Sequence, residues 1–430
     1  MHLFFSGIGG TGIGPLALIA KQAGHQVSGS DAKNSGYISH LRKLGVTDIH
    51  IGQSAEKLAA VHAARPVDWL IYSSALNSAA NHPELAFCQK HNIKTSKRDE
   101  LLNEIIQSRK LRLIAIAGTH GKTTTTAMVV WLFKQIKETV SYSVGAKISF
   151  GGMGHFQSDS RYFVYECDEF DRNFLAFRPY LSLITGIAHD HHEIFPTAED
   201  YNQAFIDFIG QSERTVLWQR DFKRLGLVVD RSYSVLSEDD PAIEQLKLPG
   251  LYNRRDAWLA AQAVHQLTKK PLGELAGHLN FFPGVSRRFE KLRPNLYSDY
   301  AHTPEKITAA LSVADETARR GGQAVAVVYE PLTNRRMHYQ KNLYHSLFSG
   351  LKALYWVPSY LAREDPAQKI LTPRELIEGL DEPARAIAKP MKLGHELEKA
   401  IRSHLKRGDL VLCLSGGGGG SLDEWLRQRF

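Results

Sequence analysis

The sequence predicts an α/β protein with largely parallel sheets. Short β-branched or aromatic runs alternate with helical patterns along the chain, which is the order that parallel sheets need. Glycine-rich loops follow two of the expected strands, at residues 7–12 and 117–126. The chain has 430 residues, 43% of them hydrophobic, which is enough for two or three domains with separate cores.

The first hundred residues read as one α/β segment. The opening run at residues 2–6 is short and apolar and leads straight into glycines, so we expect a buried strand, a tight turn and a helix. The other elements expected here are strands at 26–30 and 69–72, and helices after Gly12, around 39–43 and at 83–91.

A second segment begins near residues 101–110, where a polar stretch precedes the apolar strand 111–116. That strand opens into the second glycine loop and then into a helix rich in threonine and valine, the order that a phosphate-binding loop requires. The further expected elements are strands at 162–165, 181–184 and 215–218 and an alanine-rich helix at 254–267.

A third segment follows a boundary near residues 281–283. Its expected strands lie at 295–298, 324–328, 353–357 and 410–414, with helices between them. Residues 416–420 are all glycine, and they fit an anion-binding nest and a flexible turn equally well.

The charge balance favours small anionic ligands over nucleic acid. Lysine and arginine number 53 against 45 acidic residues, a net charge of +8, yet no basic block is longer than two or three residues. Three scattered cysteines argue against a disulfide framework or a zinc site. The start lacks signal-peptide features and no apolar run approaches about 18 residues, so we expect a cytoplasmic protein without membrane insertion.

The first glycine loop is ambiguous on its own. Gly7, Gly9 and Gly12 satisfy the dinucleotide fingerprint, and Asp31 lies about 20 residues on, where an acid holds a ribose hydroxyl. Because a helix N-terminus favours any pyrophosphate, a nicotinamide cofactor and a UDP-sugar both fit. A tight turn that only lets the helix pack closely is the third interpretation.

The second loop is the more specific signal. Its run from Gly118 to Lys122 precedes four threonines at a strand-to-helix junction. Glycines let backbone N–H groups approach a polyphosphate, Lys122 supplies a point charge, and the Thr123 hydroxyl can reach a magnesium ion. The loop is shorter than the P-loop pattern, and a threonine-capped helix start is the alternative. We expect it to bind a nucleoside triphosphate that the protein consumes.

Acidic side chains cluster just after the strand expected at 162–165. The cluster consists of Glu166, Asp168, Glu169 and Asp171. Magnesium prefers hard oxygen ligands, so the cluster predicts a metal role beside the second loop. The three histidines between residues 189 and 192 lack the cysteines or the spacing of a zinc site.

The motifs taken together resemble the Mur ligases in order and spacing, along nearly the whole chain. They are Gly7-Ile-Gly-Gly-Thr-Gly12, Ser-Gly-Ser-Asp31, Ala117-Gly-Thr-His-Gly-Lys-Thr-Thr-Thr125, Glu166-Cys-Asp-Glu-Phe-Asp171, Asp190-His-His-Glu193, Gly284-Val-Ser-Arg-Arg-Phe-Glu290 and Asp299-Tyr-Ala-His-Thr-Pro304. The resemblance implies a Rossmann-like UDP-sugar-binding domain at 1–106, a central P-loop ATPase-type domain at 107–282 and a C-terminal Rossmann-like amino-acid-binding domain at 283–430. It also favours a UDP-sugar over NAD for the first loop.

Within that family the resemblance is strongest to the ligases that join L-alanine to UDP-N-acetylmuramate in peptidoglycan precursor synthesis. It implies ATP and Mg²⁺ as cofactors and UDP-N-acetylmuramate and an amino acid as partners, in a monomer or weak homodimer. In the implied reaction a carboxylate attacks the γ-phosphate of ATP, and the amine of the amino acid then attacks the acyl phosphate. Such chemistry depends mainly on positioning and charge neutralisation.

The resemblance also assigns residues to the site. The catalytic residues it implies are Lys122, Glu166, His191 and Arg288. The implied ATP-binding residues are Gly118, Thr119, His120, Gly121, Lys122, Thr123, Thr124, Asn253, Arg288 and Asp299. The implied UDP-sugar-binding residues are Gly7, Gly9, Gly10, Thr11, Gly12, Asp31, Ser73 and Ser74. The implied metal ligands are Thr123, Glu166 and His191, and the amino-acid side is assigned to His302 and Arg336.

Departures from the family pattern concentrate on the amino-acid side. Thr303 belongs to a motif closer to that of the diaminopimelate- or lysine-adding members, and Leu332 lies in another altered segment. Tyr252 and Asp256 flank Asn253 where histidine and asparagine are usual. Three alternatives therefore stay open: a ligase that adds a recycled murein peptide to the same sugar nucleotide, an NAD-dependent oxidoreductase with an extra nucleotide-binding module, and a nucleotide-binding regulator without turnover.

Overall fold

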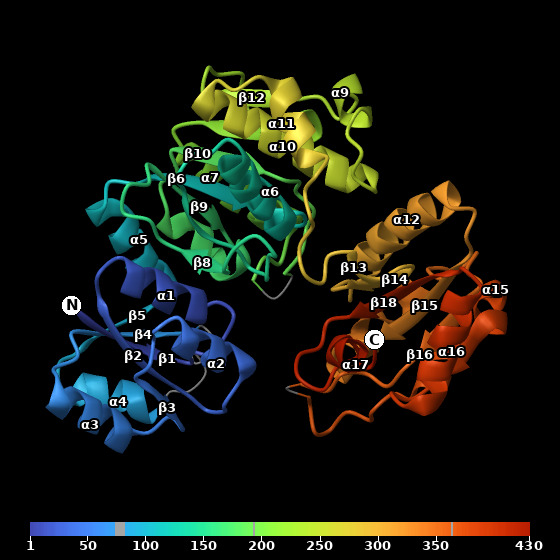
Figure 1. The fold of residues 1–430 in the computed structure, drawn as a ribbon, viewed down its shortest axis with the longest axis horizontal. Coiled ribbons are helices and arrows are strands. Elements are labelled where there is room, and N and C mark those ends of the chain that lie inside the picture. Colours follow the sequence, from blue (N-terminus) through green and yellow to red (C-terminus); the bar gives the residue numbers. More distant parts are fainter. Residues whose placement is uncertain (74–81, 192–193, 363) are drawn as a thin grey trace. The chain divides into compact units, whose positions relative to one another are not determined.

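The computed structural model describes residues 1–73, 82–191, 194–362 and 364–430 (Figure 1). Within these residues the chain forms three mainly parallel sheets that follow one another along the sequence. The α/β class expected from the alternation of strand and helix patterns is confirmed. Contacts along the chain define two compact units, residues 1–246 with 255–283 and residues 247–254 with 284–430.

The first sheet is parallel throughout and has the order β3-β2-β1-β4-β5. Its strands are β1 (His2–Ser6), β2 (Gln26–Asp31), β3 (Ile49–Ile51), β4 (Trp69–Tyr72) and β5 (Lys94–Lys97). Its helices are α1 (Gly14–Gln22), α2 (Gly36–Lys43), α3 (Ala55–Ala64), α4 (Pro83–Lys90) and α5 (Arg98–Ser108). The apolar strand β1 is buried along its whole length, as a central parallel strand is. The strand order reverses beside β1, and the first glycine loop leaves its carboxyl end, where such sheets bind ligands.

The second sheet has the order β12-β11-β10-β6-β9-β7-β8 and is parallel except for the β7–β8 pair. Its strands are β6 (Arg112–Ala117), β7 (Ser141–Ser143), β8 (Gly154–His155), β9 (Tyr162–Glu166), β10 (Leu181–Ile184), β11 (Thr215–Trp218) and β12 (Tyr233–Leu236). Its helical segments are α6 (Lys122–Gln135), η2 (Phe170–Ala176), α7 (Ala198–Gly210), α8 (Gln219–Arg224), α9 (Pro241–Glu244), α10 (Leu251–Thr268) and α11 (Leu272–Leu279). The central strand β6 leads into the second glycine loop, and the loop opens into the largely buried helix α6.

The third sheet has the order β13-β14-β18-β15-β16-β17, with only the β13–β14 pair antiparallel. Its strands are β13 (Glu290–Arg293), β14 (Leu296–Asp299), β15 (Val325–Glu330), β16 (Ala353–Trp356), β17 (Ala388–Pro390) and β18 (Leu410–Ser415). Its helical segments are α12 (Pro304–Arg320), α13 (Asn334–Gln340), η3 (Lys341–Tyr344), α14 (Pro373–Glu378), α15 (Glu382–Ile387), α16 (His395–Lys406) and α17 (Leu422–Arg429). The buried strands β15 and β18 lie side by side in its middle.

The first two sheets share one hydrophobic core cluster. Leu16 and Ile19 of α1 and Phe156, just after β8, are members of this cluster. A Cβ at Gly154 would lie 2.5 Å from the carbonyl oxygen of Pro15, so glycine is needed where β8 meets α1. The third sheet has its own clusters, one on each face.

Most expected strands are present with nearly the expected bounds, and those at 2–6, 69–72, 181–184 and 215–218 match the structure at both ends. The alanine-rich helix begins three residues earlier than expected, at Leu251, and α5 covers most of the stretch where the first boundary was expected. The sequence patterns missed short or polar strands, namely β3, β5, β7, β8, β12, β13 and β17. No helix in the described part of the chain is long and apolar enough to cross a bilayer.

Candidate active site

The second glycine loop connects β6 to α6 and turns sharply at two glycines. Gly118 and Gly121 have φ angles of +140° and +82°, in the region that favours glycine. A Cβ at Gly118 would lie 2.2 Å from the hydroxyl oxygen of Thr185, so no larger residue fits there. The loop therefore presents backbone N–H groups at the start of a fourteen-residue helix, an arrangement that binds anions.

Lys122, the first residue of α6, is held by the loop and by the acidic cluster. Its ammonium donates to the Gly118 carbonyl oxygen and to Oε2 of Glu169, both at 2.6 Å. Burial lowers the pKa of Lys122, but Glu169, Asp168 and Glu166 outweigh that effect and raise it. Lys122 is therefore charged and lies beside the phosphate-binding loop.

Thr123 and Glu166 meet at the carboxyl edge of the central sheet. The Thr123 hydroxyl donates to Oε1 of Glu166 at 2.8 Å, and the backbone N–H of Gly145 donates to Oε2 at 2.9 Å. A hydroxyl and a carboxylate are oxygen ligands of the kind Mg²⁺ takes, usually with water and substrate phosphates completing its shell. The residues fit Mg²⁺ in this sense, and no three His, Cys, Asp or Glu side chains in the described ranges form a metal cage by themselves.

His191 lies beside the same acidic cluster, where its ring contacts Glu169. Its Nε2 is 3.8 Å from Oε1 of Glu169, and its ring meets the Phe170 ring edge-on. His191 has a φ of +57°, an uncommon conformation for a residue other than glycine. The neighbouring His189 ring contacts the carbonyl oxygen of Phe195 at 2.8 Å, whereas the adjacent residues 192 and 193 lie outside the described ranges.

The first glycine loop is braced by Asp31. The backbone N–H of Gly9 donates to Oδ2 of Asp31 at 2.9 Å, and Gly7 has a φ of +79°. The loop also includes Gly10, Thr11 and Gly12, and Ser73 follows β4 at the same edge of the sheet. Ser74, which was expected to contact the UDP-sugar, lies outside the described residues.

Arg98 is a cation at the first loop that the sequence patterns missed. Its Nη1 lies only 2.5 Å from where a Cβ at Gly12 would be, so the guanidinium rests against the loop. Its Nε is 3.5 Å from Asp99 and its Nη2 is 3.9 Å from Asp168. Arg98 therefore lies between the first glycine loop and the acidic cluster of the second sheet.

In the C-terminal unit, two arginines lie over one aromatic ring at the start of the third sheet. The guanidinium carbons of Arg287 and Arg288 are 4.6 and 5.3 Å from the centre of the Tyr300 ring. Asp299, at the end of β14, accepts hydrogen bonds from the backbone N–H groups of Phe289 at 2.6 Å and Ala301 at 2.8 Å. Burial raises the pKa of Asp299, and the charge of Arg288 opposes that rise.

His302 follows Asp299 in the sequence and is buried. Burial and the positive charge of Lys306 lower the pKa of His302 to about 3, so its ring is neutral at physiological pH. Arg336 is in the first turn of α13, and its charge also lowers the His302 pKa. Asn253, in the same compact unit, donates its side-chain amide to the Pro249 carbonyl oxygen at 2.7 Å.

The glycine run after β18 is packed tightly at its start. A Cβ at Gly416 would lie 3.0 Å from Leu332 and 3.1 Å from His302, and one at Gly417 would lie 2.6 Å from Ser421 and from the Tyr360 ring. Gly418 to Gly420 are exposed. Close packing thus accounts for the first two glycines of the run.

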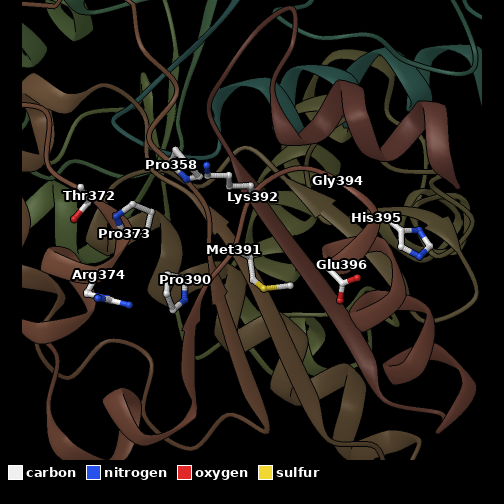
Figure 2. Close-up of a pocket in the computed structure, with 10 residues that line it drawn as sticks. All are labelled: Pro358, Thr372, Pro373, Arg374, Pro390, Met391, Lys392, Gly394, His395 and Glu396. Atoms are coloured by element: carbon white, nitrogen blue, oxygen red, sulfur yellow. The ribbon is translucent and has the colours of Figure 1, made fainter.

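A separate open hollow of about 610 Å³ lies at the carboxyl ends of β16 and β17 (Figure 2). Its lining includes Pro358, Arg374, Pro390, Lys392, His395 and Glu396. None of the site residues expected from the sequence lines it. The hollow therefore gives no support to the predicted amino-acid side at His302 and Arg336.

The sequence patterns also missed two buried polar residues beside the second loop. Tyr201 of α7 lies 2.8 Å from the Thr119 hydroxyl, and a Cβ at Gly121 would lie 2.7 Å from a carboxylate oxygen of Asp256. Both residues are distant from the loop in the sequence. The only sequence signal was that Asp256 stands where the family usually has asparagine. The loop is thus supported by polar side chains that local spacing does not reveal.

These features define a class of three-sheet α/β protein. The first glycine loop lies on the first sheet, and the second glycine loop, with its lysine and acidic cluster, lies on the central sheet. Two family models match these parts of the chain, the Mur ligase family catalytic domain at residues 2–110 and the Mur ligase middle domain at residues 116–224. The protein belongs to the Mur ligase family.

Curated relatives and solved structures cover almost the entire chain. The UDP-N-acetylmuramate–L-alanine ligase of Renibacterium salmoninarum is 30% identical over 97% of this chain and 93% of its own length. Two solved structures have similar folds: UDP-N-acetylmuramate-alanine ligase MurC of Thermotoga maritima (TM-score 0.76, 23% identity, 100% of this chain and 98% of that one) and the murein peptide ligase mpl of Psychrobacter arcticus (TM-score 0.64, 20% identity, 100% and 98%). The three-sheet architecture is thus that of the Mur ligases.

Proposed function

We propose that this protein joins L-alanine to the carboxylate of UDP-N-acetylmuramate and converts ATP to ADP and phosphate. The observation that carries the proposal is the contact network of the second loop, in which Lys122, Thr123 and Glu166 gather where a triphosphate would bind. The near-complete, 30% identical match to an L-alanine ligase supports the choice of substrates.

The loop and its lysine serve the first half of the reaction. The backbone N–H groups of the loop bind phosphate oxygens, and the charged Lys122 neutralises the β- and γ-phosphates. Thr123 and Glu166 would hold Mg²⁺, which supplies charge neutralisation at the phosphates. The sugar carboxylate oxygen attacks the γ-phosphorus, the bond to the bridging oxygen breaks, and ADP leaves.

The second half of the reaction forms the amide. The neutral amine of alanine attacks the acyl carbon, phosphate leaves, and the amine gives up a proton. Arg288 and Asp299 are proposed for the ATP side of the C-terminal unit, with His302 and Arg336 on the amino-acid side. Because burial keeps the His302 ring neutral and its lowered pKa makes it a weak base, His302 is suited to accept a hydrogen bond rather than a proton.

The first loop is proposed to hold the diphosphate of UDP-N-acetylmuramate. Gly7, Gly9 and Gly12 let the backbone approach a pyrophosphate at the start of α1. Asp31 already accepts a hydrogen bond from the loop, which keeps the loop in shape. Arg98 adds a positive charge next to Gly12. We expect the enzyme to act as a monomer or weak homodimer, which sedimentation at assay concentration will measure.

An ADP-release assay with a panel of amines tests the function. With ATP, Mg²⁺ and UDP-N-acetylmuramate present, we expect release to need L-alanine and to be weaker with glycine and L-serine. ADP release that occurs with the murein tripeptide L-alanyl-γ-D-glutamyl-meso-diaminopimelate but with none of the amino acids would identify a recycling ligase instead. NADH consumption without any amine-dependent ADP release would contradict both.

A further inference from the structure

Lys122 is the main hydrogen-bond and ion-pair partner of the buried carboxylate of Glu169. Only 1% of the Glu169 side chain is exposed, and its Oε2 accepts from the Lys122 ammonium at 2.6 Å. The other oxygen, Oε1, lies 3.3 Å from the Tyr201 hydroxyl and 3.8 Å from Nε2 of His191. A buried carboxylate is costly unless donors surround it, so the loss of Lys122 must be compensated.

Tyr201 connects Glu169 to the phosphate-binding loop. This fully buried residue of α7 has its hydroxyl oxygen 2.8 Å from the hydroxyl of Thr119, which is part of the loop. The Thr119 oxygen also lies 2.8 Å from the Ala188 carbonyl oxygen and accepts from the Ala188 N–H at 2.9 Å. The loop, α7 and the acidic cluster are thus joined by a chain of two hydroxyl groups.

Each of these hydroxyls has a single proton, so the same atomic positions allow two hydrogen-bond patterns. In one, Thr119 donates to the Ala188 carbonyl and Tyr201 donates to Thr119, which leaves Oε1 of Glu169 without the tyrosine proton. In the other, Thr119 donates to Tyr201 and Tyr201 donates to Glu169. The second pattern supplies Glu169 with a donor that the first withholds.

Lys122 has to serve two anions when a nucleotide binds. Its ammonium contacts Glu169, and the proposed function also places it on the β- and γ-phosphates of ATP. We propose that Tyr201 is a positioning residue for the ATP step, which turns its hydroxyl proton to Glu169 as Lys122 turns to the phosphates. This inference rests on the proposed ATP-binding role of the loop.

The variant Tyr201→Phe isolates the hydroxyl. Phenylalanine keeps the aromatic packing against Phe195 and Phe205 but has no proton to give to Glu169. Moving Lys122 to the phosphates then leaves the carboxylate short of a donor, so ATP binding weakens. We expect the Kd and KM for ATP to rise about five- to tenfold, with kcat changed less than about twofold.

A double-mutant cycle with Glu169→Gln separates this role from packing. A neutral amide does not need the tyrosine proton, so Tyr201→Phe in the Glu169→Gln background should change the Kd for ATP less than about twofold. An equal fold-change in both backgrounds would show that Tyr201 acts by packing and would overturn the proposal. If Glu169→Gln does not unfold cooperatively, Glu169→Asp replaces it, because the shorter carboxylate is out of reach of Tyr201 and the coupling should also be lost.

Tyr142→Phe is the matched control, because Tyr142 is a buried tyrosine of β7 whose described contacts lie outside this hydroxyl chain. Its ATP affinity should equal that of the unmodified protein. Direct titration with ATP and Mg²⁺, without sugar nucleotide or amino acid, keeps the two proposals apart. Unchanged ATP affinity in Tyr201→Phe would overturn the role of Tyr201, whereas absence of L-alanine-dependent ADP release would overturn only the ligase function.

Discussion

Lys122 has a structural role as well as a proposed chemical one, because it neutralises the buried Glu169. In Lys122→Ala, we expect ADP release to fall at least about a thousandfold and the affinity for UDP-N-acetylmuramate to stay nearly the same. The unpaired Glu169 should also cost about 3–5 kcal/mol of folding free energy. Urea unfolding of Lys122→Ala and of Lys122→Ala/Glu169→Gln measures this, and the second change should restore most of the stability but no activity.

Asp256 is a buried carboxyl packed against the phosphate-binding loop. Burial raises the pKa of Asp256 well above its usual value, and the Thr125 hydroxyl and the charge of Arg220 offset this only in part. Well below the ordinary aspartate pKa of 3.8, both the folded and the unfolded chain hold the proton, so the raised pKa costs nothing. As the pH rises the unfolded chain ionises first, and the folded state loses stability relative to it until the pH passes the folded pKa.

Replacement of Asp256 by asparagine should therefore stabilise the protein in a pH-dependent way. We expect Asp256→Asn to be more stable by about 1–3 kcal/mol at pH 8, with the gap shrinking steadily towards pH 5. Denaturant unfolding across that range is the measurement, with the exposed Asp159→Asn as the control that shows no such trend. A gap that widens as the pH falls would contradict this account.

The sequence predicted the site residues whose partners lie nearby in the chain and missed those whose partners lie far away. Gly118, Lys122 and Thr123 were predicted because a strand, a loop and a helix follow one another within a few positions. Tyr201 was not, because its partner Thr119 is 82 positions away and only the fold brings α7 beside the loop. Arg98 was missed for the same reason, since its contact with Gly12 needs the pairing of β5 with the first sheet.

At the scale of elements, α7 is held by a capping box. The Thr197 hydroxyl accepts the backbone N–H of Asp200, whose carboxylate accepts the backbone N–H of Thr197 in return. Thr197→Ala should cost about 1 kcal/mol. Because α7 belongs to the first compact unit, Thr197→Ala should lower the midpoint of that unit's calorimetric transition. Thr372→Ala removes the corresponding capping box of α14 and should lower the midpoint of the C-terminal unit instead.

The strands that the sequence predicted are those whose own composition favours burial. β1, β10 and β11 are mostly apolar or β-branched and are buried along their whole length, and their bounds were read correctly. β5 has the sequence Lys-Thr-Ser-Lys, and only its parallel pairing with β4 makes it a strand. The same holds for β8, which has only two residues and pairs with β7. Long-range pairing, absent from local patterns, thus explains the missed strands.

At the scale of the whole molecule, the chain consists of two compact units, each with its own core. The cluster shared by the first two sheets contains residues between 3 and 225, whereas both clusters of the third sheet lie beyond residue 295. The division into domains at 106/107 and 282/283 stays a prediction. The boundary at 282/283 offers the stronger test of this division, because the first compact unit ends at Pro283.

A chain that ends at Pro283 should fold and bind its nucleotides but not form the amide. It keeps both glycine loops, Glu166 and the shared core, and it loses Arg288 and all of the third sheet. We expect UDP-N-acetylmuramate affinity within about threefold of the full chain, because the first loop and its helix are intact. L-alanine-dependent ADP release should be undetectable, since the groups proposed for the amino-acid side are gone.

Calorimetry of the full chain and of the chain that ends at Pro283 tests whether the two units unfold separately. Two separate cores should give the full chain two transitions, and the shortened chain should keep the one that UDP-N-acetylmuramate shifts upward. Residues 247–254 lose their partner Glu316, which pairs with Arg254 at 2.8 Å, so the start of α10 should fray without unfolding the rest. A shortened chain that fails to unfold cooperatively would mean that the first two sheets depend on the third for stability, contrary to the separation of their cores.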